Sequence, residues 1–182
     1  SLDKKKLLNP NYNRHYCLGW NYRMPELACA VALAQVENID PLVERRIEVG
    51  NLFKSVVEPY SEWFRPQLTP ENCDHSYWTF VAQLIRKDIS WTNLRDTFQK
   101  FGGDGIYACW KLTYEEPFVT NLDFLRRDNF ISKNNIEKYR SNPCPVAESI
   151  QPNLFQFKTN YWNLNRAHEQ AEILKLTLEH YN

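Results

Sequence analysis

The 182-residue sequence predicts an α+β (α/β) fold with a modest, mostly antiparallel or mixed sheet. Three observations support this prediction. Residues 77–110 read as strand, helix and strand. Two helical patterns precede them, over 25–38 and 40–60. A short strand pattern at 154–157 and a closing helix follow them. The expected order is therefore a buried helix, an amphipathic helix and a small unit of mixed structure.

The first expected helix begins at Pro25, because proline suits a first helical position whose N–H would be unpaired anyway. Glu26 complements the helix dipole in the first turn. Residues 27–36 are small and apolar on nearly every side, which predicts a buried helix. The second helix begins after Asp40 as N-cap, runs to about Tyr60, and is amphipathic.

A central strand is expected over 77–85, where β-branched and aromatic residues leave both faces nearly apolar. Ser90 is a predicted N-cap for the helix that follows. Gly102 and Gly103 end that helix, since glycine accepts the left-handed conformation at little cost. A second strand is expected over 105–110.

The last third of the chain has a less regular pattern. Residues 111–143 predict a long loop with one short helix, and 145–149 a helical turn. A strand at 154–157 precedes a final helix, which either Asn163 or Asn165 caps.

Charge, cysteine content and hydropathy exclude several function classes. Lys plus Arg and Asp plus Glu number 22 each, so the basic excess typical of nucleic-acid binders is missing. The five cysteines form no CxxC pair, so no zinc site is expected and reduced thiols in a cytoplasmic protein are the simplest interpretation. No apolar run reaches the length of a membrane-spanning helix, so no membrane association is expected.

One long gapped pattern carries a family resemblance. It comprises Gly19-Trp20-Asn21-Tyr22-Arg23-Met24-Pro25, the alanine-rich helix through Leu33-Ala34-Gln35-Val36-Glu37, and Arg45-Arg46. Weaker matches are His75-Ser76-Tyr77-Trp78 and Cys144-Pro145-Val146-Ala147-Glu148. The sequence thus closely resembles the DegT/StrS-type sugar-nucleotide aminotransferases, which have the aspartate aminotransferase-like fold type I.

The resemblance implies an enzyme that depends on pyridoxal phosphate. Such enzymes pass an amino group from a donor, usually glutamate, to a keto-sugar nucleotide, and they act as cytoplasmic homodimers in polysaccharide or antibiotic sugar synthesis. It also implies that residues 1–40 are the end of the large cofactor-binding domain. Residues 41–182 would then be an interdomain helix and the small C-terminal domain.

The resemblance also supplies candidate site residues. Asn21 is expected to reach the cofactor phosphate of the other subunit, with a turn asparagine as the alternative. Arg23 is expected at the phosphate or a substrate carboxylate, with a structural ion pair as the alternative. His75, Tyr107 and Trp110 are candidate substrate-binding residues.

Two of those three residues, His75 and Trp110, also have a structural alternative. A histidine near a strand start is more often structural, and Trp78, Trp91 and Trp110 at strand and helix positions are more often in the core than stacked on a ligand. The adjacent carboxylates Glu115 and Glu116 are expected to be solvated rather than catalytic.

Two departures from the family pattern affect the expected activity. After Gly105-Ile106 the sequence has no His-Tyr-Pro, and no lysine stands before a Gly-Glu-Gly-Gly-like turn. No catalytic residue is therefore assigned, and the chain by itself is expected to be inactive as the C-terminal part of an aminotransferase. The alternatives are a pyridoxamine-phosphate-dependent sugar dehydratase of the same family and a non-catalytic dimerisation or carbohydrate-binding module. Self-association is expected through the apolar helix at 25–38.

Overall fold

The computed structural model describes residues 23–115 and 144–182. The chain divides into two compact units, Ser1–Ile39 and Asp40–Asn182, and each is described by itself.

The described part of the first unit contains the helix α2, Glu26–Glu37, with Pro25 at its N-cap. Its predicted position is confirmed, but the expectation that it is buried is wrong for the described residues, because no residue of α2 is buried. Leu27, for example, is 80% exposed. A helix that is apolar on every side needs neighbours around its whole circumference to be buried.

The second unit begins with the helix α3, Ile39–Val57, and a 3-10 turn, η1, Glu58–Tyr60. Asp40 lies in the first turn of α3, so the helix starts slightly earlier than the predicted N-cap. Val49, Gly50, Phe53 and Val57 form its buried face. Their spacing of three and four residues gives the amphipathic pattern that the sequence predicted.

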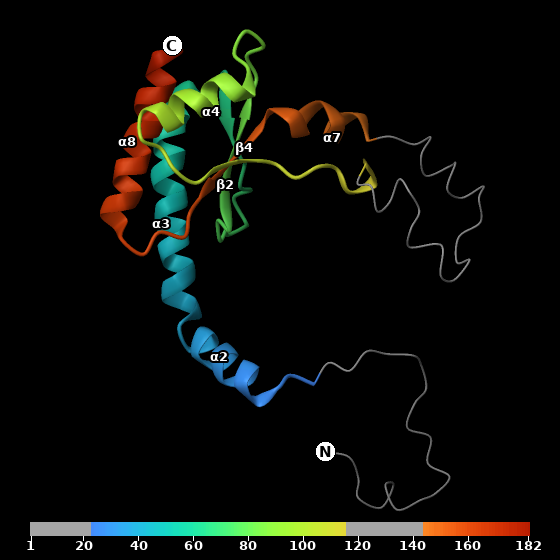
Figure 1. Ribbon diagram of the computed structural model, residues 1–182, viewed down its shortest axis with the longest axis vertical. Coiled ribbons are helices and arrows are strands. Elements are labelled where there is room, and N and C mark those ends of the chain that lie inside the picture. Colours follow the sequence, from blue (N-terminus) through green and yellow to red (C-terminus); the bar gives the residue numbers. More distant parts are fainter. Residues whose placement is uncertain (1–22, 116–143) are drawn as a thin grey trace, which may run out of the picture. The chain divides into compact units, whose positions relative to one another are not determined.

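A four-stranded sheet forms the centre of this unit (Figure 1). The strand order is β1-β2-β4-β3, with β1 at Phe64–Pro66, β2 at Thr79–Leu84, β3 at Ile106–Ala108 and β4 at Leu154–Lys158. Every neighbouring pair is antiparallel, which confirms the predicted type of sheet. β1 was not predicted, since it is only three residues long.

The remaining helices of the unit are α4, Trp91–Lys100; α7, Pro145–Ile150; and α8, Leu164–His180. Two further 3-10 turns are η2, Thr113–Glu115, and η4, Gln151–Asn153. Ser90 Oγ accepts the Asn93 N–H at 3.0 Å, so the predicted cap of α4 is confirmed. Asn163 rather than Asn165 caps α8.

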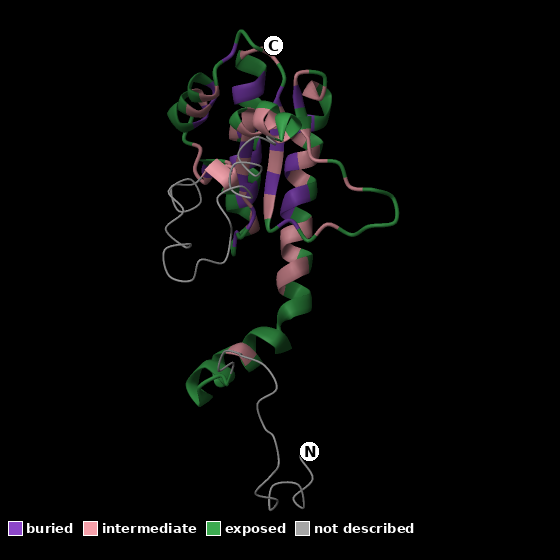
Figure 2. Ribbon diagram, turned by 90° about the vertical axis from the view of Figure 1, so that its right-hand side faces the viewer, coloured by how far each residue is buried: buried purple, intermediate pink, exposed green. Residues whose placement is uncertain are grey.

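One hydrophobic core lies between a face of the sheet and the helices α3, α4 and α8. Figure 2 shows the buried residues concentrated in the sheet and on the adjoining helices. β2 lies between β1 and β4, which confirms the predicted central strand, although β2 and β4 bury alternate residues only. Phe157 of β4 lies opposite Phe80 of β2 and Ile106 of β3, which joins three strands in the core. The other face of the sheet is left partly exposed.

Among the described residues, no helix is both long and apolar enough to span a membrane. Cys29, Cys73, Cys109 and Cys144 are free thiols.

Candidate functional site: a pocket on the outer face of the sheet

A pocket of about 270 Å³ opens beside the outward-facing residues of β2, β3 and β4, and at the end of the sheet Arg46 of α3 and the buried Thr159 also line it. All of its residues belong to the second unit, and they come from α3, the start of β2, β3, and β4 with the loop that follows. The lining residues are Arg46, Trp78, Thr79, Tyr107, Gln156, Lys158, Thr159 and Asn160. Strand register brings several of them together, because Thr79 lies opposite Lys158 and Tyr107 opposite Gln156.

An unusual backbone conformation places Trp78 at the pocket. Tyr77 has a φ of 45°, in the left-handed region that non-glycine residues rarely adopt. Its buried ring lies directly against Gly50 of α3, where any Cβ would overlap it. The His75 ring accepts the Tyr77 N–H through Nδ1 at 2.8 Å. The chain therefore reverses locally, and Trp78 follows with its side chain 67% exposed.

Arg46 and Thr159 both form hydrogen bonds at this reversal. Arg46 Nη1 donates to the Trp78 carbonyl at 3.0 Å and lies 3.3 Å from Thr159 Oγ1. The Thr159 hydroxyl lies 2.6 Å from the Tyr77 carbonyl and 3.1 Å from the Trp78 carbonyl. The helix α3 and the end of β4 are thus both hydrogen-bonded to the same turn.

Two of the predicted substrate-binding residues lie at this site. Tyr107 lines the pocket from β3 and is 57% exposed. Trp110 follows β3 and is 79% exposed, and its ring meets that of Trp78 edge-on, with centroids 6.4 Å apart at 77°. The expectation that Trp78 and Trp110 belong to the core is therefore wrong. Trp91 differs from both, because it is half-buried and stacks on Phe155 at 5.0 Å.

Lys158 lies at one side of the pocket, and its ammonium group extends toward Asp104 and Tyr161. Its Nζ is 4.0 Å from Asp104 Oδ1 and 4.5 Å from the centre of the Tyr161 ring. Asp104 also receives the Tyr161 hydroxyl at 3.0 Å and Arg166 Nη2 at 3.1 Å. Partial burial alone would raise the pKa of Asp104, but these donors and the nearby cations outweigh it, so the pKa is lowered. The pKa of Tyr161 is raised, by burial first and by its bond to Asp104 second.

The other candidate residues are not gathered at this pocket. His75 contacts Tyr77, and its Nε2 lies 3.1 Å from Gln67 Nε2, so in this structure it supports the turn before β2. Asn21 lies outside the described residues. Arg23 is exposed and belongs to the first unit. The ligand-binding roles of all three remain predictions.

Sequence reasoning did not assign a role to Arg46 or Lys158. Arg46 was noticed only as part of a paired arginine, and the predicted strand at 154–157 stopped one residue short of Lys158. Strand alternation could have found Lys158, because it shares the outward parity of Gln156. No local signal could have shown that Arg46 reaches a turn more than thirty residues away.

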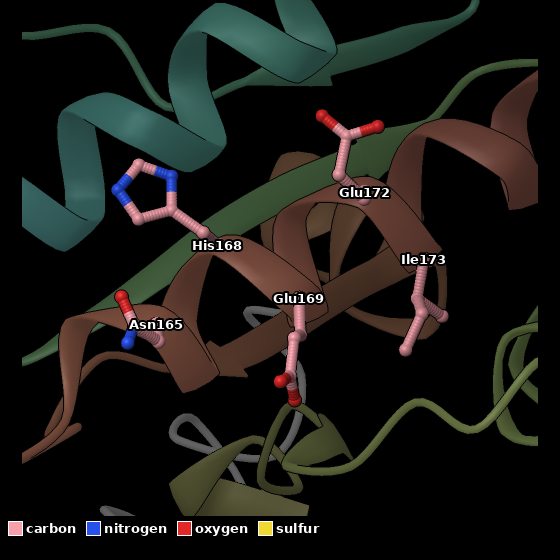
Figure 3. A pocket seen from close by; sticks show the side chains of 5 residues that line it. All are labelled: Asn165, His168, Glu169, Glu172 and Ile173. Atoms are coloured by element: carbon pink, nitrogen blue, oxygen red, sulfur yellow. The ribbon is translucent and has the colours of Figure 1, made fainter.

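A second hollow follows the exposed side of α8, lined by Asn165, His168, Glu169, Glu172 and Ile173 (Figure 3). Its side chains do not converge, since Glu169 and Glu172 point in different directions. Glu169 is paired with Arg166 at 2.8 Å. Across residues 23–115 and 144–182, no three His, Cys, Asp or Glu side chains are grouped in a way that would hold a metal ion.

Comparison with known proteins gives two sequence relatives. One is the UDP-4-amino-4,6-dideoxy-N-acetyl-beta-L-altrosamine transaminase of Campylobacter jejuni, 28% identical over 109 residues, which cover 58% of this chain and 28% of the relative. Another is GDP-perosamine synthase of Escherichia coli O157:H7, 32% identical over 76 residues, which cover 40% of this chain and 19% of the relative. The chain therefore matches only 19–28% of the length of these relatives.

A solved structure and a family model extend the comparison. A crystal structure of GDP-4-keto-6-deoxymannose-3-dehydratase with a trapped PLP-glutamate geminal diamine superposes with a TM-score of 0.58. It covers 89% of this chain and 38% of that protein at 16% identity, which shows the shared fold and confirms the predicted α+β class. The family model of the DegT/DnrJ/EryC1/StrS aminotransferases matches residues 4–146. The chain belongs to the DegT/DnrJ/EryC1/StrS aminotransferase family.

Proposed function

We propose that this chain is part of a pyridoxal-phosphate-dependent aminotransferase that moves an amino group from glutamate to a keto-sugar nucleotide. The observation that carries the proposal is the family match over residues 4–146. The names of two relatives, a transaminase of a UDP-linked sugar and a GDP-perosamine synthase, support a sugar-nucleotide substrate. A cytoplasmic location and a role in polysaccharide synthesis belong to the same proposal.

In this proposal residues 1–40 end the cofactor-binding domain, and residues 41–182 form the interdomain helix and the small domain. The division of the chain between Ile39 and Asp40 supports this boundary. The exposed apolar side chains of α2 support a homodimer, because apolar surface of this kind is normally covered in an assembly.

When bound, pyridoxal phosphate supplies the electron sink for amino transfer. The residues around the pocket do not fit the whole cofactor. Lys158, the lysine of the pocket, does not suit the covalent role, because Thr159-Asn160-Tyr161 follow it instead of the Gly-Glu-Gly-Gly-like turn that accompanies the covalent lysine in the resembling enzymes. A cofactor site would need residues outside the described ranges, and Asn21 remains the candidate phosphate contact there.

The outer face of the sheet would contribute to substrate binding instead. Tyr107 and Trp110 present exposed aromatic surface that can pack on a sugar or a base. Thr79, Gln156 and Asn160 add polar groups that can hydrogen-bond to hydroxyls. The described residues of the second unit therefore have the chemistry of a binding surface for the substrate.

The test is an assay of the full-length protein encoded by the gene, supplied with pyridoxal phosphate, glutamate and a UDP- or GDP-linked 4-keto-6-deoxy sugar. We expect 2-oxoglutarate to form together with an amino sugar detected by mass spectrometry. The 182-residue chain, assayed beside it, is expected to give no turnover.

The possible products separate the alternatives. A deoxy keto sugar without nitrogen would identify a dehydratase, and the absence of any glutamate-dependent product would contradict the proposal. In the full-length enzyme, Tyr107→Ala is expected to raise KM for the sugar nucleotide with little effect on KM for glutamate. Trp91→Phe, a change at a half-buried ring that stacks on Phe155 and does not line the pocket, is the matched control and should leave both KM values unchanged.

A further inference from the structure

We propose that the pocket around Arg46 is a phosphate subsite that holds the diphosphate of the nucleotide, while the Trp78–Trp110 pair packs against the base. This inference rests on the proposed function for the identity of the substrate. It adds Arg46, Lys158 and Trp78 to the substrate-binding residues and gives each a separate role.

Arg46 is a half-buried cation with no counter-ion among the described residues. Its neighbour Arg45 differs in this respect, because its Nε lies 3.7 Å from Glu48. Withdrawing a charge from water is costly unless an opposite charge or a set of hydrogen bonds replaces the water. None of the eight residues that line the pocket is acidic. A bound anion would therefore supply the missing charge.

The free hydrogen-bonding capacity of Arg46 suits a phosphate. Both of its hydrogen bonds within the described residues use Nη1, to the Trp78 carbonyl and to Thr159. These bonds fix the plane of the guanidinium and leave Nε and Nη2 available. A planar guanidinium with two available donors can bind phosphate oxygens in a bidentate manner.

Lys158 provides a second cation that can move toward the pocket. Asp104 already receives closer donors from Tyr161 at 3.0 Å and from Arg166 at 3.1 Å. Lys158 Nζ lies farther away, at 4.0 Å, so it makes the weakest contact with that carboxylate. Its long, flexible side chain lines the pocket. Two cations near one pocket match the two phosphoryl groups of a nucleoside diphosphate.

The size of the pocket decides which part of the ligand it holds. A volume of about 270 Å³ is below the roughly 300–1,000 Å³ typical of sites that enclose a whole drug-sized ligand. It is therefore too small for a complete sugar nucleotide, and the base would lie outside it. The exposed rings of Trp78 and Trp110 lie beside the pocket, and aromatic rings stack on any base with little sequence preference.

The test is a calorimetric titration of the 182-residue chain with UDP, in the absence of pyridoxal phosphate and of any amino donor. UDP is expected to bind, and Arg46→Gln is expected to weaken binding at least tenfold while keeping an amide donor near the Trp78 carbonyl. Arg45→Gln is the matched control and should bind UDP like the wild type. Equal affinity of the wild type and Arg46→Gln, or no binding of UDP at millimolar concentration, would overturn the inference.

A second variant keeps the test valid if Arg46→Gln does not fold. The ring of Trp110 is mostly exposed, so Trp110→Ala should keep the fold. This variant is expected to weaken UDP binding several-fold and to leave the affinity for inorganic pyrophosphate unchanged. An equal loss for both ligands would contradict the division between base and phosphate.

Glutamate serves as the competing probe. If glutamate displaces pyrophosphate and UDP does not, the pocket is a carboxylate site and the inference fails. Binding is measured without catalysis, so the two proposals can fail separately. UDP binding through Arg46 in a protein that never transaminates would overturn the proposed function alone, and transamination with no loss of UDP binding in Arg46→Gln would overturn the subsite alone.

Discussion

β4 presents two different surfaces within five residues. Phe155 and Phe157 point into the core, and Phe157 contacts aromatic rings from α3, α4 and β2. Gln156 and Lys158, between and beside them, point into the outer pocket. The two faces differ in what they can tolerate, because the core is closely packed and the outer face is partly open to solvent.

This difference separates stability from binding within one sheet. The phenylalanines bury apolar area, which is the main source of folding free energy. The outer side chains add little burial, so they are available for contacts with a ligand. The turn at Tyr77 lies at the margin of the core, because its ring is buried and its carbonyl accepts a hydrogen bond from the buried Thr159.

The difference between the two faces is tested most directly by substituting two adjacent residues of β4. Phe157, 1% exposed, lies at the centre of the core, and Phe157→Ala is expected to lower the free energy of unfolding by about 3–5 kcal/mol. Gln156→Ala, on the opposite face, is expected to change it by no more than about 0.5 kcal/mol. Urea denaturation monitored by circular dichroism measures both. Similar losses for the two variants would show that the outer face also stabilises the fold.

A smaller effect is expected at the margin of the core. In Gly50→Ala the added Cβ overlaps the Tyr77 ring, and the overlap costs about 1–3 kcal/mol. The higher helix propensity of alanine offsets up to about 1 kcal/mol of this cost, so a net loss of stability is expected. Because Tyr77 must shift, UDP binding should also weaken. Ser55→Ala, on the exposed side of α3, is the control that should alter neither stability nor binding.

The smallest effect is expected at Asp104, and it depends on pH. Its folded pKa is lowered, so the carboxylate contributes stability above its unfolded pKa of about 4, and this contribution is lost as pH falls through the lower folded pKa. Asp104→Asn should therefore lower Tm slightly at pH 7, and the difference from the wild type should shrink as pH falls below the ordinary aspartate pKa of about 4. A constant difference at all pH values would mean that the charge of Asp104 is not the cause.

Local sequence signals predicted the elements of the second unit well. Ser90 and Asn163 act as N-caps, and Gly102, with a φ of 93°, ends α4. These features depend on a few neighbouring residues, whose hydrogen-bonding and conformational preferences are the same in any fold. β1 was not predicted because three residues are too few to show a periodic pattern, and they form a strand only through pairing with β2.

The candidate site was only partly predictable for a related reason. Tyr107 and Trp110 came from the family resemblance and lie at the outer face, as does Trp78, which sequence reasoning favoured as a core residue. Composition cannot distinguish a tryptophan of the core from one on the surface, since both positions occur at the ends of strands.

The sequence by itself determined the α+β class, the order of most elements and their caps, because these follow from periodicity and short-range chemistry. It also determined the family, through a long motif that resembles other members. The tertiary structure alone decided which face of the sheet became the core and which carries the pocket. It also decided that Arg46, Trp78 and Lys158 meet there. Their meeting depends on strand register and on the left-handed turn at Tyr77, and both are set by packing between segments far apart in the chain.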